Sequence, residues 1–93
     1  MSEEWVIKMA MSDLVEQYDL KYMGMTDAAW YCKNMGLDNQ YDIYVGCEDD
    51  EFFFDITDEM GEVVKGGAFP TMQALIDYGL KTAIQELGWP LVE

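Results

Sequence analysis

The chain has 93 residues, of which 19 are Asp or Glu and five are Lys, with no Arg and no His, so its formal net charge is -14. This charge excludes direct binding to nucleic acid or to an anionic membrane, because both attract proteins through Lys and Arg. Any partner should therefore be basic.

The apolar content excludes a disordered acidic tail. Hydrophobic residues make up 51% of the chain, and three Trp, six Tyr and four Phe add large apolar side chains that offset the entropy of ordering. We expect one domain over residues 1–93, with roughly two thirds of the unfolded surface buried on folding. No apolar run approaches the roughly 18 residues that span a bilayer, and no signal segment opens the chain. These features predict a cytoplasmic protein.

The first third of the chain predicts a helical hairpin. Residues 4–11 alternate like a strand but also line up at helical spacing, so both remain open. Ser12 as an N-cap predicts a helix over about 12–22, beginning there or earlier. Gly24 interrupts this helix, and Thr26 and Gly36 bound a second short helix. The methionines near the turn could form a soft binding surface, although core filler is the default interpretation: Met23, Met25 and Met35.

The middle of the chain changes to a period of two, which predicts an antiparallel meander of three or four strands. The expected strands are Tyr41–Glu48, Phe52–Thr57 and Glu62 to about Gly66. Glu48–Glu51 and Asp58–Gly61 are the expected turns, with positive φ at Gly61. Phe53 falls on the outward face, where it is either covered by a helix or exposed to a partner.

The last element is an amphipathic helix over about 71–87, with Pro70 in its first turn and Gly88 and Pro90 at its end. Gly79 in mid-helix indicates close approach of the sheet or of another helix. The complete prediction is an α+β fold, in which a helical hairpin precedes the meander and the last helix packs on the sheet.

The sequence does not indicate an enzyme, a cofactor or a metal site. There is no His to transfer protons, no Arg to clamp phosphate and no Gly-rich phosphate loop. An EF-hand alignment on Gly61 places Ile56 first and Gly67 twelfth, so that pattern fails. We expect Cys32 and Cys47 to be reduced and buried, although pairing stays open if their Cα atoms lie within about 7 Å.

The main functional indication is a run of ten carboxylates without any Lys or Arg between Asp38 and Glu62. Side chains on one face of a strand recur about every 6.6–6.8 Å, which is comparable with successive phosphates on a nucleic-acid strand. The run therefore predicts a phosphate-like surface that binds the basic site of a nucleic-acid-binding protein. The candidate contact residues are Asp42, Glu48, Asp49, Asp50, Glu51, Asp55, Asp58, Glu59 and Glu62.

In size, concentrated acidity and lack of Arg, the whole chain resembles small phage-encoded DNA-mimic inhibitors of the anti-restriction-nuclease and anti-CRISPR classes. The resemblance implies an inhibitor that occupies the DNA site of a host nuclease, CRISPR effector or nucleoid regulator, in the host cytoplasm if the protein is phage-encoded. The resemblance implies no particular fold and no role for any individual residue.

A second hypothesis is a protein-protein adaptor, in which the acids only provide solubility. Such an adaptor would bind through aromatic and Met side chains and would be insensitive to salt. Its expected aromatic contacts are Trp30, Tyr31, Phe53 and Trp89. Under either hypothesis we also expect a homodimer if the outer edge of the meander or the Trp5 segment is uncovered.

Overall fold

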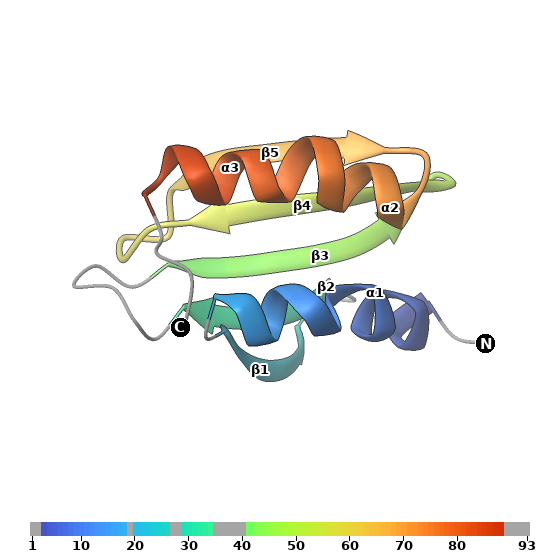
Figure 1. Cartoon of the computed structure of the whole chain (residues 1–93), viewed down its shortest axis with the longest axis horizontal. Coiled ribbons are helices and arrows are strands. Elements are labelled where there is room, and N and C mark those ends of the chain that lie inside the picture. Colours follow the sequence, from blue (N-terminus) through green and yellow to red (C-terminus); the bar gives the residue numbers. More distant parts are fainter. Residues whose placement is uncertain (1–2, 19, 27–28, 35–40, 89–93) are drawn as a thin grey trace.

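A computed structural model describes residues 3–18, 20–26, 29–34 and 41–88 and shows an α+β fold (Figure 1). One antiparallel sheet contains five strands in the order β1-β2-β3-β4-β5, so each strand pairs with its sequence neighbours. The elements are α1 (Glu3–Gln17), β1 (Leu20–Thr26), β2 (Ala29–Asn34), β3 (Asp42–Glu48), β4 (Glu51–Thr57), β5 (Val63–Phe69), and a C-terminal helix made of α2 (Met72–Ala74), η1 (Leu75–Leu80) and α3 (Lys81–Glu86).

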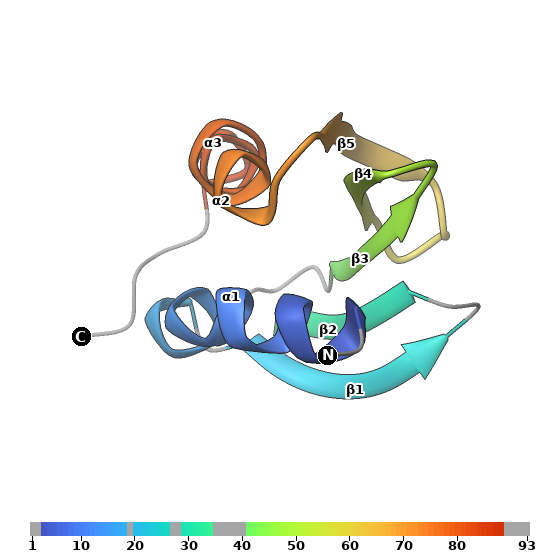
Figure 2. The ribbon, with the colours of Figure 1, turned by 90° about the vertical axis from the view of Figure 1, so that its right-hand side faces the viewer.

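The sheet curls around the helices, so that one of its faces is concave and covered while the other is convex (Figure 2). Helix α1 contacts β1, β2 and β3, whereas η1 contacts β4 and β5. Each buried Leu, Ile or Phe side chain in this layer contributes about 1.5–3 kcal/mol through removal of apolar surface from water. The fully buried large side chains are Trp30, Ile7, Met11, Leu14, Ile43, Ile56, Leu75, Leu80, Ile84, Val45 and Cys32.

The predicted meander is confirmed for β3, β4 and β5, to which the structure adds β1 and β2. Ile43 and Val45 are buried, as the period of two requires, and they pair with Ile56 and Phe54 of β4. The turn at Glu48–Glu51 joins β3 to β4. Strand β5 runs on to Phe69, past the expected end near Gly66.

The predicted helical hairpin is wrong, because β1 and β2 occupy that part of the chain. Trp30 and Cys32 of β2 are buried, whereas Tyr31 and Lys33 are half-buried on the opposite face, which is the alternation of a strand. The Tyr22 ring of β1 stacks on Trp30 at a centroid distance of 5.2 Å. Pairing of β2 with β3 and the burial of Trp30 outweigh the local helix signals.

Glycine and threonine near residue 25 were the misleading signals. Gly24 does have a positive φ of 113°, but it lies inside β1, where the register with β2 shifts between Tyr22 and Gly24. Thr26 is the last residue of β1 and begins no helix. Met35 and Gly36 lie outside the described residues.

Helix α1 begins earlier than the expected N-cap and resolves the ambiguity over residues 4–11 in favour of helix. Ser12 lies in mid-helix, where its hydroxyl donates to the carbonyl of Met9 at 2.8 Å, as Ser inside helices commonly does. Leu14 and Tyr18 are buried, Val15 is half-buried against the core, and the helix ends at Gln17, before the expected end near residue 22.

The C-terminal helix matches the predicted extent. The Thr71 hydroxyl accepts from the Ala74 N–H at 3.1 Å and caps the helix, and Gly88 follows its end at φ 77°. Within it, η1 has the wider π-helical pairing, so the N–H of Lys81 reaches the carbonyl of Ile76. Pro90 lies outside the described residues.

The expected close approach at Gly79 is confirmed. A Cβ on this residue would lie 2.5 Å from Phe69 Cε2 and 2.7 Å from Phe54 Cε1, distances that real Cβ atoms do not show. The helix backbone therefore rests directly on the two rings.

Gly79→Ala should destabilise the protein by about 1–3 kcal/mol, because the added methyl forces the two rings apart. Ala normally stabilises a helix by about 1 kcal/mol relative to Gly, so the expected sign is opposite to that of helix propensity. Urea unfolding measures the difference, with exposed Gln85→Ala as the control within about 0.5 kcal/mol of wild type. Equal or greater stability of Gly79→Ala would contradict the packing described here.

The homodimer remains a prediction. Strand β5 pairs with β4 on one side, and no described strand lies on its other side, so its outer N–H and C=O groups can pair with a second β5. Because each chain carries a net charge of -14, screening by about 0.5 M salt should favour the dimer. Sedimentation equilibrium at low and high salt tests this, and a monomer mass in both conditions would refute it.

Candidate partner-binding site

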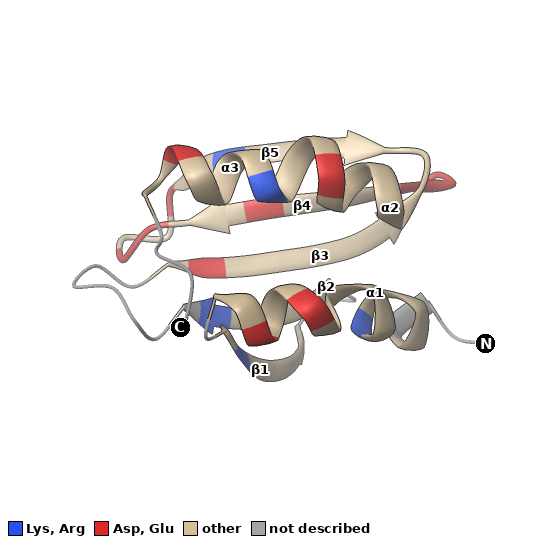
Figure 3. Cartoon of the chain, in the orientation of Figure 1, with Lys and Arg blue, Asp and Glu red and all other residues tan. Residues whose placement is uncertain are grey.

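The nine candidate acids lie on the β3-β4-β5 part of the sheet, where they form two groups and one central position (Figure 3). The β3–β4 turn carries one group, and the other lies at the opposite end of the strands, in the β4–β5 turn and at the start of β3. A seven-residue strand separates the ends by about 20 Å. The first group is Glu48, Asp49, Asp50 and Glu51, the second is Asp42, Asp58, Glu59 and Glu62, and Asp55 lies between them.

The β3–β4 turn has a conformation that is unfavourable for its residues. Asp49 and Asp50 have φ values of 52° and 64°, which are the positive values of a type I′ turn. Such turns favour Asn-Gly and Asp-Gly, so Asp49 suits the first position. Asp50 stands where Gly is preferred, because positive φ strains side chains that carry a Cβ. Glu48 pairs directly across from Glu51, and facing like charges destabilise a strand pair. All four side chains are exposed.

The β4–β5 turn uses one of its acids structurally. Asp58 Oδ1 accepts from the N–H groups of Met60 at 2.9 Å and Glu62 at 3.0 Å, and Gly61 supplies the expected positive φ of 81°. These bonds fix the turn. A shallow cleft of about 270 Å³ beside it is lined by Tyr41, Asp58, Glu59, Met60 and Val64.

Asp42 and Asp55 lie on the convex face. The Lys33 ammonium lies 3.3 Å from Asp42 Oδ1 and 5.7 Å from the centre of the Tyr31 ring. A side-chain hydrogen bond with Tyr31, followed by the bond and the attraction to Asp42, raises the pKa of Lys33. Of the nine candidate acids, only Asp42 forms an ion pair with a described residue.

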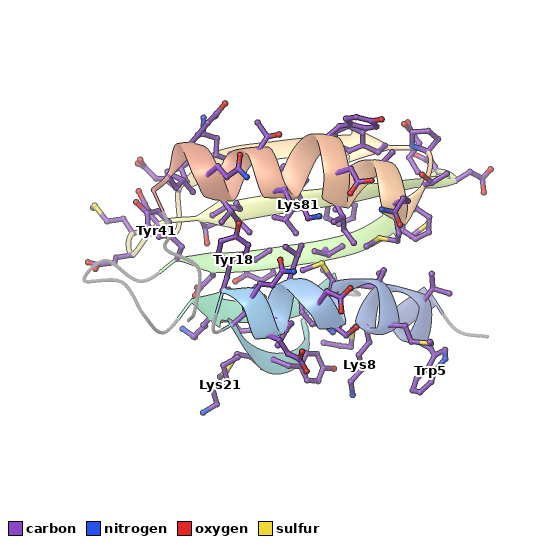
Figure 4. The ribbon with its side chains drawn as sticks, viewed as in Figure 1. Trp5, Lys8, Tyr18, Lys21, Tyr41 and Lys81 are labelled. Carbon is purple, nitrogen blue, oxygen red and sulfur yellow. The ribbon has the colours of Figure 1, made fainter. Side chains whose placement is uncertain are left out.

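No lysine among the described residues forms an ion pair with an acid of either turn. Lys8 and Lys21 project from the α1–β1 side of the molecule (Figure 4), where the Lys8 ammonium lies 4.9 Å from the centre of the Tyr22 ring. Lys65 pairs with Glu86, and Lys81 lies 3.7 Å from Asp77, so these two lysines bind acids of the C-terminal helix. The turns consequently keep their full negative charge.

Sequence reasoning missed an aromatic pair beside the acids on the convex face. The rings of Tyr31 and Tyr44 stack with centroids 4.9 Å apart, because β2 and β3 place the two residues directly opposite each other. The helix predicted over β2 concealed this register. Phe53 is half-buried on the same face, and no described helix covers it.

Trp30 does not serve as the adaptor contact that the sequence suggested. Its side chain is 1% exposed in the core, and its Nε1–H has no hydrogen-bond partner among the described residues. Trp89 lies outside the described residues.

Cys32 and Cys47 are both free thiols, so the possible disulfide is absent. Cys32 is buried as expected, and burial raises the pKa of its thiol, while Cys47 is half-buried. Among the described residues, no three Asp, Glu, Cys or His side chains converge as metal ligands. No described helix has the length and apolarity to cross a membrane.

Comparison with protein-family models, curated proteins and solved structures finds no match to this chain.

Replacing Asp49 by Asn and Asp50 by Gly should stabilise the protein by about 1 kcal/mol, because Asn-Gly relieves the positive-φ strain. The melting temperature should rise by about 4–8 °C for a chain of this size. Calorimetry measures the change, with Asp58→Asn as a control that removes one charge but keeps an oxygen to accept from Met60 and Glu62. An unchanged or lower melting temperature of the double variant would show that the turn is not strained.

Proposed function

We propose that this protein is a non-catalytic inhibitor that presents a phosphate-like acidic surface to the basic nucleic-acid-binding site of another protein. The observation that carries the proposal is the β3–β4 turn. Four consecutive acids occupy it, two at positive φ and two facing each other, and none forms an ion pair with a described residue. Asp50 at positive φ and the facing pair Glu48 and Glu51 are unfavourable for the fold, so selection for binding is the simplest reason for them.

The distribution of the acids supports a nucleic-acid-like partner surface. The two turns and Asp55 distribute charge along roughly 20 Å of strand, which equals about three phosphate intervals of a nucleic-acid strand. Both turns are held by a paired sheet, so little conformational entropy is lost when they bind. The net charge of -14 would attract a basic partner over a distance and raise the association rate at low salt.

The proposed partners are a nuclease, a CRISPR effector or a nucleoid regulator. Duplex DNA would compete for the same site on such a partner, whereas this chain would not bind the DNA itself. We therefore expect proteins captured from a bacterial lysate by the tagged chain to elute at moderate salt and to be displaced by duplex DNA. Mass spectrometry of the eluate identifies them.

A matched pair of variants tests the role of the turn. Asp49→Asn with Asp50→Asn and Asp13→Asn with Glu16→Gln each change the net charge from -14 to -12, but only the first pair changes the turn. The first should weaken binding of the captured partner by tenfold or more, at about 1–2 kcal/mol per lost contact, whereas the α1 control should retain most of the affinity.

Two results would contradict the proposal. One is capture only of proteins that survive high salt and ignore duplex DNA. The other is equal loss of affinity in the turn variant and the α1 control, because it would mean that total charge and not its placement determines binding.

An adaptor that binds through apolar side chains remains the alternative, and exposed side chains on α1 favour it. Trp5 and Met9 lie one helical turn apart and are 50% and 59% exposed, and Met23 and Met25 of β1 are also exposed. Exposed Met and Trp side chains are typical of adaptable binding surfaces. Binding that is insensitive to salt and lost in Trp5→Ala would favour this alternative.

A further inference from the structure

The convex face carries an acid whose cross-strand neighbour has no side chain. The register places Asp55 of β4 directly between Tyr44 of β3 and Gly66 of β5. A Cβ built on Gly66 would lie 2.9 Å from Asp55 Oδ1, so the carboxylate leans over the glycine. Gly66 and Ala68, two residues further along β5, are both exposed. The surface beside Asp55 is therefore acidic and exposed, and no large side chain of β5 covers it.

The same face already holds a cation beside an acid, on strands β2 and β3. There the cross-strand partner of Asp42 is Lys33, whose ammonium lies 3.3 Å from the carboxylate and close to the Tyr31 ring. The position that Lys33 occupies beside Asp42 corresponds to the position of Gly66 beside Asp55. An aromatic ring also lies on this face, because Phe53 precedes Asp55 by two residues on β4.

The charge of the surroundings limits what can fill this position. No described lysine pairs with Asp55, and Glu48 and Glu51 lie on the same strands towards the turn. An anion would be repelled, and so would the same acidic face of a second copy of the chain, whose net charge is -14. A cationic side chain from another protein is complementary to the surface.

We propose that Phe53, Asp55 and Gly66 form an arginine-binding site on the convex face, in which an arginine of the basic partner takes the place of the missing cross-strand side chain. A guanidinium can lie flat over Gly66, pair with the Asp55 carboxylate in bidentate fashion and stack against Phe53. An ammonium is more strongly hydrated and lacks the planar shape, so arginine is preferred over lysine. The inference rests on the proposed function and adds to it the residue type that the partner supplies.

Two synthetic peptides of equal length and charge, six Arg-Gly repeats and six Lys-Gly repeats, test the site on the intact chain. Isothermal titration at about 0.15 M salt should show the arginine peptide binding about three- to tenfold more tightly. Asp55→Asn and Phe53→Leu should each reduce this ratio towards one. Asp13→Asn on α1 removes the same charge as Asp55→Asn elsewhere, and it should leave the ratio unchanged.

A spectroscopic measurement locates the contact and does not depend on the variants. In wild-type protein, NMR titration with the arginine peptide should shift the ring resonances of Phe53 and the amide of Gly66. The lysine peptide should shift them less at equal saturation. If Phe53→Leu does not fold, Asp55→Asn and this titration still decide the question.

The outcomes separate this inference from the proposed function. Equal affinity for both peptides, with no loss of preference in Asp55→Asn, would overturn the arginine site, and DNA-displaceable capture from lysate would still support the inhibitor. Absence of any DNA-displaceable partner would overturn the proposed function, whereas an arginine preference that is lost in Asp55→Asn would still support the arginine site.

Discussion

The structure depends on one constraint, which is that every described helix packs against the same face of the sheet. The buried apolar side chains of β2, β3 and β4 point to that concave face, where α1 and the C-terminal helix cover them. The opposite side chains of the same strands are left to the convex face. Asp42, Asp55 and the half-buried rings of Tyr31, Tyr44 and Phe53 lie there because their positions alternate with those of the buried residues.

Contact between glycines and aromatic rings determines the distance between the C-terminal helix and the sheet. Gly79 and Gly67 both face the rings of Phe54 and Phe69, so the helix backbone approaches β4 and β5 without intervening side chains. This approach positions β5 and, with it, the β4–β5 turn that carries part of the acidic surface. The placement of charge on one side of the sheet thus depends on packing on the other side.

The sequence was sufficient to predict the elements whose patterns are local. Strict alternation identified β3 and β4, and helical spacing identified the C-terminal helix and the close approach at Gly79. Strands β1 and β2 were missed, because Gly24 and Thr26 imitate helix ends and because the strand conformation there depends on pairing with β3. A segment of only six or seven residues is too short for its period alone to distinguish strand from helix, so pairing with the neighbouring strands decides its conformation.

The distinction between local sequence patterns and strand pairing applies to the candidate site as well. The acids of both turns could be located from the sequence, since turns follow directly from the strands that flank them. The positive φ values of Asp49 and Asp50 could be recognised only from the structure of the two-residue turn, and the stack of Tyr31 on Tyr44 only from the position of β2.

The turn conformation is the more informative finding, because it distinguishes acids that stabilise the fold from acids that do not. Asp58 belongs to the first kind, with two hydrogen bonds to its own turn, whereas Asp50 has a positive φ at a position that favours Gly. A charge placed for solubility alone could be carried at any exposed position that is free of this strain.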